Sequence, residues 1–253
     1  MTRGDAVRAR VLLLGGTGEA RRLAAALEHH PRVEAISSLA GRVREPARPA
    51  GAVRIGGFGG VEGLLDWLRT NEIAAVIDAT HPFASTMTRS AAAATERLAL
   101  PYVVLQRPGW EPRDGDDWHW VDRVGDLPVP GERVFLTTGR TDAAAFAASD
   151  RWFLLRSVDP PEPPLPARLT VLLNRGPYPV DGELALLREH RIDLLVTKNS
   201  GGQQTAAKLT AARELGLPVV IVRRPKLPAV AIVETEAQAV AWLENVIPDS
   251  GGA

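Results

Sequence analysis

A short apolar run followed at once by three glycines constrains the fold of this chain more than any other feature. Residues 11–14 read Val-Leu-Leu-Leu, and a glycine-rich turn comes directly after them. Such a run is typical of a strand buried on both faces of a parallel sheet, followed by a tight turn and a helix. The turn and the start of the helix contain Gly15, Gly16, Thr17, Gly18 and Glu19. Because the first N–H groups of a helix are unpaired and positively polarised, we expect these residues to bind the pyrophosphate of a nicotinamide dinucleotide.

The glycine turn matches the dinucleotide-binding pattern G-x-G-x-x-G only in part. Counting from Gly16 places Arg21 where the third small residue should stand. Counting from Gly15 instead places Thr17 at the second glycine position and Ala20 at the third. An ATP-binding loop would require Gly-Lys-Ser/Thr, and no lysine lies nearby. A turn in which the glycines serve only for tightness remains the alternative.

The composition argues against a nucleic-acid-binding or membrane protein. The 30 lysines and arginines balance the 30 aspartates and glutamates, whereas nucleic-acid binders usually show a basic excess. No apolar run reaches membrane-spanning length, and Met1 leads almost directly into the first strand, so we expect a cytoplasmic location. Zero cysteines exclude disulfides, thiolate catalysis and cysteine-based metal sites, and no metal site is predicted. We expect a monomer or a weak homo-oligomer.

The first half of the chain alternates apolar strands with amphipathic helices. The predicted strands are residues 11–14, 33–38, 53–55, 73–77 and 101–106. This order implies a doubly wound sheet with strand order 3-2-1-4-5, in which the first and fourth strands flank the ligand-binding switch point. Thr80 and His81 follow the fourth strand, and Pro82 next to them predicts a helix start. We therefore expect Thr80 and His81 to form a second wall of the cofactor site.

The end of the second strand predicts which dinucleotide binds. An acidic residue about 20 positions after the glycines would bind the 2′-hydroxyl of NAD. This chain has Ser37, Ser38 and Arg42 there, and no acid before Glu45. Hydroxyls with an arginine suit a 2′-phosphate, so NADPH is the predicted cofactor. The alternative is that Arg42 is only a solvated loop charge.

The second half predicts a second parallel α/β unit whose strands end in polar residues. We expect an N-terminal dinucleotide-binding domain over residues 1–108 and a C-terminal substrate domain over 109–253. The expected architecture is α/β, with two Rossmann-like domains and with cofactor and substrate in the cleft between them. Since the carboxyl ends of parallel strands meet at one edge, these polar residues would form a positive rim for an anionic substrate. The rim residues are Thr138, Gly139, Arg140, Arg175, Lys198, Asn199, Ser200 and Gly201.

Together these segments resemble the precorrin-6A reductase family of cobalamin biosynthesis. The resemblance covers nearly the whole chain and is carried by residues 15–21 (Gly-Gly-Thr-Gly-Glu-Ala-Arg), 78–84 (Asp-Ala-Thr-His-Pro-Phe-Ala), 138–140 (Thr-Gly-Arg) and 197–202 (Thr-Lys-Asn-Ser-Gly-Gly). It implies a two-domain enzyme that uses NADPH to reduce one double bond of precorrin-6A, giving precorrin-6B. The substrate would be an anionic tetrapyrrole, whose carboxylates an arginine-rich site can pair.

A reduction of this kind also needs a proton at the neighbouring ring carbon. The candidate donors are His81, Lys198 and water. His81 could equally cap the following helix, and Lys198 could contact a carboxylate or a phosphate. Both residues are retained as candidate catalytic residues.

Two other functions compete with this interpretation. Short-chain dehydrogenases and epimerases need a Tyr-x-x-x-Lys pair, but Tyr102 and Tyr178 are followed four positions later by Gln106 and Gly182. A non-catalytic NAD(P)H-binding sensor remains possible, although it would leave the polar rim of the second half unexplained.

Overall fold

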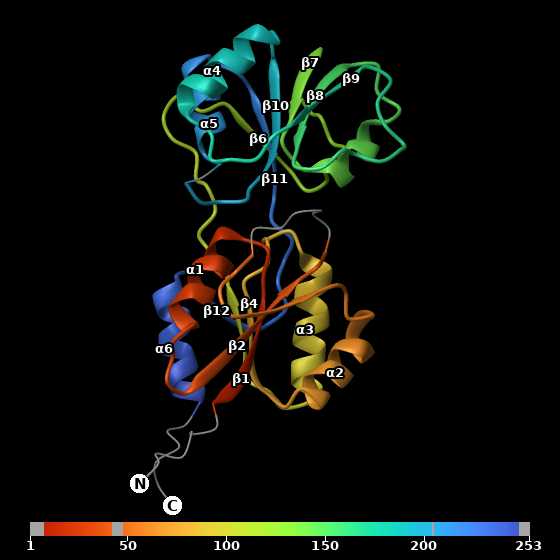
Figure 1. The fold of residues 1–253 in the computed structure, drawn as a ribbon. Helices are drawn as coiled ribbons and strands as arrows, with labels where there is room; N and C mark the ends of the chain where they lie inside the picture. The colour runs from red at the N-terminus through yellow and green to blue at the C-terminus, as the bar shows by residue number, and fades with distance from the viewer. Residues whose placement is uncertain (1–7, 42–47, 204, 248–253) are drawn as a thin grey trace, which may run out of the picture. The chain divides into compact units, whose positions relative to one another are not determined.

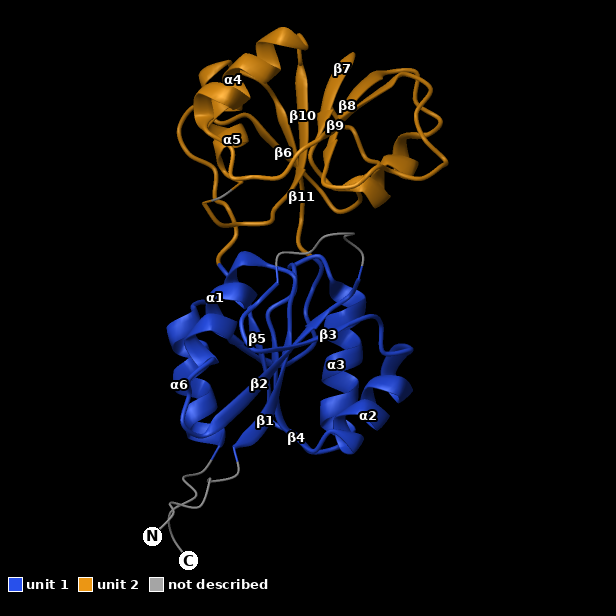
Figure 2. Cartoon of the chain, in the orientation of Figure 1, with its two compact units in different colours: residues 1–107, 225–253 blue, residues 108–224 orange. Residues whose placement is uncertain are grey.

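The chain folds into two compact units, and it passes from one unit to the other at two points, which we call crossings. The computed structural model describes residues 8–41, 48–203 and 205–247. Unit 1 contains the chain up to Arg107 and again from Pro225, and unit 2 contains residues 108–224 (Figure 2). The crossings therefore lie at Arg107–Pro108 and at Arg224–Pro225.

Unit 1 is built on a six-stranded, wholly parallel sheet of order β12-β5-β4-β1-β2-β3. Its strands are β1 (Ala9–Leu14), β2 (Val33–Leu39), β3 (Ala52–Ile55), β4 (Ile73–Asp78), β5 (Tyr102–Leu105) and β12 (Ala231–Val233). The predicted order 3-2-1-4-5 is confirmed for the first five strands. The edge strand β12 was not predicted.

Helices cover both faces of this sheet (Figure 1). They are α1 (Gly18–Leu27), α2 (Gly60–Thr70), α3 (Ser85–Arg97) and α6 (Glu236–Val246). Because successive strand side chains point to opposite faces, Val11 and Leu13 pack against α1 and α6, whereas Leu12 and Leu14 pack against α2 and α3. The strand that carries the glycine turn is thus buried on both sides, as its unbroken apolar run predicts.

The single domain boundary expected after residue 108 is corrected by the path of the C-terminal segment. Ala231–Val233 pairs with Val103–Leu105 of β5, and α6 packs on α1 through buried Ala239 and Leu243. Thr235 and Gln238 form a capping box that starts α6. A three-residue strand carries too little periodicity to reveal its partner, so the return of the chain to unit 1 was missed.

Unit 2 contains a second parallel sheet of order β6-β11-β10-β7-β8-β9. Its strands are β6 (Trp118–Val121), β7 (Arg133–Leu136), β8 (Trp152–Ser157), β9 (Leu169–Leu173), β10 (Leu194–Lys198) and β11 (Val219–Val222). One face packs on α4 (Val180–Glu189) and α5 (Ala207–Glu214) around Phe135, Leu154 and Leu195. After β7 the chain forms a 3₁₀ helix, η1 (Arg140–Phe146). The α/β class with two Rossmann-like parallel sheets is confirmed.

Candidate functional site

The glycine turn after β1 exposes backbone where an anion can approach. Gly16 has φ of +116°, a conformation that favours glycine, and no atom lies within 4 Å of the position a Cβ would take. Thr17 caps α1, since its Oγ1 accepts a hydrogen bond from the Ala20 N–H at 3.1 Å. The turn therefore combines an open backbone with the positive end of a ten-residue helix, which fits a phosphate group.

The structure brings the segment after β4 against this turn. The Thr17 hydroxyl donates to the Ala79 carbonyl at 2.7 Å, and the Ala79 N–H donates to the Leu14 carbonyl at 2.9 Å. Two segments more than 60 residues apart are thus joined directly at the ends of neighbouring strands. This is the point where the sequence predicted that the glycine turn and Thr80–His81 would converge.

Glu19 at the start of α1 is held by two arginines. Its carboxylate lies 2.7 Å from Arg107 Nη1 and 3.4 Å from Arg22 Nη2. Burial raises the pKa of the Glu19 carboxyl, but a hydrogen bond from its own backbone N–H and the guanidinium of Arg107 lower that pKa by more, so it lies below its usual value. The Glu19 carboxylate therefore stays ionised beside the turn, and the guanidinium groups of Arg107 and Arg22 balance its charge. Arg107, which follows β5 in the chain, was not predicted as part of this site.

A buried aspartate organises the segment after β4. Asp78 accepts hydrogen bonds from the Thr80 N–H at 3.0 Å, from the Thr80 hydroxyl at 2.6 Å and from the Tyr102 hydroxyl at 3.0 Å. Burial and the negative charge of Asp78 raise the pKa of Tyr102 far above its ordinary value, so the phenol stays protonated and donates. The Thr80 hydroxyl is therefore committed to Asp78. The position of Asp78 directly after the apolar residues 73–77 is the sequence feature that marks it.

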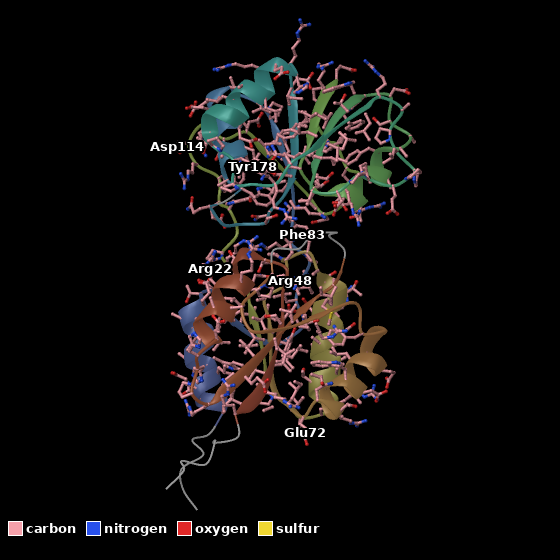
Figure 3. The ribbon with its side chains drawn as sticks, in the orientation of Figure 1. Arg22, Arg48, Glu72, Phe83, Asp114 and Tyr178 are labelled. Atoms are coloured by element: carbon pink, nitrogen blue, oxygen red, sulfur yellow. The ribbon has the colours of Figure 1, made fainter. Side chains whose placement is uncertain are left out.

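His81 is exposed in the turn that precedes α3. Its Nδ1 accepts from the Phe83 N–H at 3.3 Å, so in the neutral ring the proton resides on Nε2. Helix α3 begins at Ser85, so the helix start expected at Thr80 or His81 is placed too early. Figure 3 shows Phe83 and Glu72 at opposite ends of unit 1, because Phe83 follows β4 whereas Glu72 precedes it. His81 thus lies at the carboxyl end of the sheet, as predicted.

The residues predicted for the 2′-phosphate are dispersed. Ser37 pairs with Leu13 and Ser38 with Leu14 in the β2–β1 register, so their side chains point to opposite faces of the sheet. The Ser37 hydroxyl is buried and makes no hydrogen bond within the described ranges. The Ser38 hydroxyl accepts from Arg54 Nη1 at 2.8 Å. Arg42 lies outside the residues that the structure describes.

An ion pair marks the carboxyl edge of unit 2. Lys198 ends β10, and its Nζ lies 2.6 Å from Asp142 Oδ2 of η1, which follows the neighbouring strand β7. Both side chains are less than a fifth exposed, so a charge-stabilising contact holds the ammonium in place. Asp142 was missed, because only the fold brings it from 56 residues away.

The other residues of the predicted rim differ in their surroundings. The Thr138 hydroxyl is buried without a hydrogen bond among the described residues, and Gly139 has φ of +99° with open space where a Cβ would lie. Arg140 Nη1 lies 3.5 Å from the Pro160 carbonyl. Arg175 is exposed beyond β9, at the edge of the sheet and away from β10. The structure thus groups Thr138 and Gly139 with Lys198 but leaves Arg175 apart.

Asn199 and Gly201 contact the first and the last residues of unit 2. Asn199 Oδ1 accepts from the Trp110 N–H at 2.7 Å, and its carbonyl accepts from Arg224 Nε at 2.8 Å. A Cβ on Gly201 would lie 2.1 Å from the Pro108 carbonyl oxygen, so only glycine fits there. The Ser200 carbonyl accepts from Arg224 Nη2 at 3.2 Å. These contacts tie the entry and exit of unit 2 together, which gives Asn199 and Gly201 a structural role in addition to any contact with substrate.

A cluster of buried charges lies beneath the loop between β10 and α5. Arg156 Nη1 lies 2.6 Å from Glu183 Oε1, and the Arg156 guanidinium stacks 3.7 Å from the Tyr178 ring. Lys208 Nζ donates to the Thr205 carbonyl at 2.6 Å. Burial, followed by the charge of Arg156 and opposed by Glu183, lowers the pKa of Lys208 from 10.5 to about 7. No feature of the sequence pattern pointed to this cluster.

The cluster predicts how stability depends on pH. Between pH 7 and 10.5 the unfolded chain binds more protons at Lys208 than the folded chain does, so the free energy of unfolding should rise with pH in that window. Lys208→Met removes this titration, so the stability difference, wild type minus variant, should increase from about pH 6 to about pH 9. Urea unfolding at both pH values measures it, with exposed Lys226→Met as the control. A difference that does not change with pH would contradict the assignment.

Neither a metal cluster nor a membrane span is found in the part of the chain that the structure describes. Its histidines and carboxylates form no group of three that could hold an ion. None of its helices is both long and apolar enough to cross a bilayer.

Comparisons with known proteins give one consistent family. The family model described as precorrin-6x reductase CbiJ/CobK matches residues 10–244. A precorrin-6A reductase of Rhodococcus erythropolis is 56% identical over 240 residues, which cover 92% of this chain and 97% of that protein. One of Mycobacterium tuberculosis is 56% identical over 243 residues, covering 94% and 98%. A solved structure of a CobK precorrin-6A reductase aligns with a TM-score of 0.87 at 40% identity, covering 97% of this chain and 100% of that one. The similarity therefore extends through both units.

Proposed function

The chain belongs to the precorrin-6x reductase family, CbiJ/CobK, and we propose that it reduces one double bond of precorrin-6A to give precorrin-6B, with NADPH as hydride donor. The observation that carries the proposal is the match to this family over residues 10–244, at 56% identity to proteins named precorrin-6A reductase. The chain is accordingly an oxidoreductase of cobalamin biosynthesis. The choice of NADPH and the roles of individual residues go further and rest on the geometry of the two units.

The carboxyl edge of unit 1 fits a dinucleotide. Backbone at Gly15, Gly16 and Gly18 would hold the pyrophosphate, because Gly16 is open and α1 starts at Gly18. The buried Ser37 hydroxyl without a hydrogen bond is an orphaned polar group close to the same strand end. Thr80 and His81 would line the other side, because Thr17 bonds the adjacent Ala79. A bound NADPH supplies the hydride, which leaves positioning to these residues.

The carboxyl edge of unit 2 suits an anionic tetrapyrrole. Arg140 and Arg175 can pair acetate and propionate carboxylates through two hydrogen bonds each. The buried Thr138 hydroxyl and the open Gly139 backbone add polar groups beside Arg140, whereas Arg175 stands apart beyond β9. We assign substrate binding to this edge, with Ser200 as a further contact and with Asn199 and Gly201 acting through the loop that they hold.

Reduction requires a hydride at one carbon of the double bond and a proton at its neighbour. Lys198 is our first candidate for the proton donor, because Asp142 holds its ammonium within 2.6 Å at the edge where the substrate would bind. His81 is the second, because it is exposed at the carboxyl end of unit 1. When Lys198 donates its proton, a neutral amine remains beside Asp142. Solvent then returns a proton to this amine.

An anaerobic assay tests the proposal against the sensor alternative. Incubation with precorrin-6A should oxidise NADPH at the nicotinamide absorbance, and NADH should support a much lower kcat/KM. Folded protein that binds NADPH but oxidises none in the presence of precorrin-6A would contradict the reductase and favour a non-catalytic sensor. Equal use of NADPH and NADH would contradict only the choice of cofactor.

A further inference from the structure

We propose that Arg54, which was not among the predicted site residues, binds the 2′-phosphate of NADPH and gives the enzyme its preference for NADPH over NADH. This inference rests on the proposed function, since it names the residue that would select the cofactor.

Arg54 lies where the adenosine end of a dinucleotide would reach. It pairs with Ser38 in the register between β3 and β2, and Ser38 in turn accepts a hydrogen bond from the Gly15 N–H at 2.9 Å. One strand therefore separates Arg54 from the glycine turn, a span of about 10 Å from β1 to β3. In doubly wound sheets the ribose of the adenosine lies at the carboxyl end of the second strand, beside which Arg54 stands.

Arg54 is a half-buried cation without a carboxylate partner among the described residues. Its Nη1 donates to the Ser38 hydroxyl at 2.8 Å and to the Gly56 carbonyl at 2.9 Å, and its Nη2 donates to the Gly57 carbonyl at 3.1 Å. These bonds engage three of its five N–H groups, and within the described ranges Nε and one N–H of Nη2 make none. The guanidinium is thus oriented but not neutralised, which favours an anionic ligand.

Stacking fixes the guanidinium in this position. Its Cζ lies 3.8 Å from the centre of the Phe58 ring and 5.5 Å from that of Trp67. Burial lowers the pKa of Arg54, but an arginine remains protonated in proteins. Such a preorganised fork loses little freedom when it binds a phosphate, which favours binding of the 2′-phosphate.

The surface next to Arg54 suits an adenine ring. Ile55 is 54% exposed at the very end of β3, so its apolar side chain is open to a ligand. Gly56 and Gly57 follow it, and neither has an atom within 4 Å of the place where a Cβ would lie. An apolar side chain and open backbone thus adjoin the cation, as binding of an adenosine 2′-phosphate requires.

Titration calorimetry with two nucleotide fragments tests the inference without turnover. Wild type should bind adenosine 2′,5′-bisphosphate more tightly than 5′-AMP. Arg54→Met should weaken binding of the bisphosphate about tenfold or more while leaving 5′-AMP binding nearly unchanged. Arg97→Met is the matched control, since Arg97 pairs with Glu62 on the surface of the same unit, and it should bind both fragments as wild type does.

Three outcomes would overturn the inference. They are equal weakening of both fragments in Arg54→Met, unchanged binding of both, and a wild type that does not distinguish them. If Arg54→Met fails to fold, Arg54→Lys decides the question: it keeps the charge but loses the fork, so it should bind the bisphosphate with intermediate affinity. Wild-type selectivity for bisphosphate in Arg54→Lys would contradict the assignment.

The experiments distinguish a failure of the proposed function from a failure of the role assigned to Arg54. If Arg54→Met retains selectivity for the bisphosphate while wild type reduces precorrin-6A, the inference fails and the reductase stands. If Arg54→Met loses selectivity but wild type shows no turnover with precorrin-6A, the reductase fails and the assignment of Arg54 stands.

Discussion

Lys198→Met is expected to lower kcat for precorrin-6A reduction about 100-fold or more, with little change in the KM for NADPH. The variant removes the ammonium that Asp142 holds at the carboxyl edge of unit 2, so the proton would have to come from water. Asp142→Asn should give a smaller loss, because the ammonium remains but its position is no longer fixed by an ion pair. Steady-state kinetics under anaerobic conditions measure both variants, and exposed Lys226→Met is the control.

The division of the loss between kcat and KM decides the role of Lys198. A raised KM for precorrin-6A with unchanged kcat would show that Lys198 binds a substrate carboxylate instead of donating a proton. Wild-type kinetics in Lys198→Met, together with a large loss of kcat in His81→Gln, would transfer the role to His81. Because His81 is exposed in the turn before α3, glutamine there should leave the fold intact.

Gly16→Val is expected to weaken NADPH binding about 100-fold, equivalent to about 2.7 kcal/mol. A β-branched side chain at φ of +116° strains the backbone by about 1–3 kcal/mol and places atoms in the open space where the pyrophosphate would lie. Fluorescence titration with NADPH measures the affinity, and thermal unfolding measures the strain.

A second glycine separates these two effects. Gly216 has φ of +62° and equally open surroundings, but it follows α5 in unit 2. Gly216→Val should therefore lower thermal stability while leaving NADPH affinity unchanged. If both variants bind NADPH as tightly as wild type, the glycine turn does not hold the cofactor, and its glycines serve only to make the turn tight.

The strands and their order could be predicted because each rests on local sequence. The apolar run of β1 is buried on both faces, and glycine after it is required by the positive φ of Gly16. The return of β12 and α6 to unit 1 could not be predicted, because three strand residues carry no information about which edge they join. Helix α3 begins later than expected, because Asp78 first closes a turn through Thr80.

The candidate site was predicted where residues follow strand ends and was missed where a partner comes from elsewhere in the chain. Ala79, which precedes Thr80 and His81, bonds Thr17 of the glycine turn, so the two segments converge as expected. Arg54 and Asp142 could not be identified from their neighbours in sequence, because only strand pairing places them beside Ser38 and Lys198. The buried charges around Lys208 likewise come from three separate elements. Sequence patterns thus locate the carboxyl edges of the two sheets. The side-chain contacts at these edges, such as Arg54 with Ser38 and Lys198 with Asp142, depend on the fold.

Transfer of deuterium from NADPH to the product tests the reductase most directly. With precorrin-6A and NADPH deuterated at both C4 positions, in ordinary water and without oxygen, the product should contain one deuterium and one additional solvent hydrogen per molecule. Unlabelled NADPH in heavy water should give the complementary product, with the deuterium at the neighbouring carbon, once exchange at other positions is subtracted by a control without enzyme. Precorrin-6A recovered unlabelled and unreduced, from protein that is folded and binds NADPH, would contradict the account.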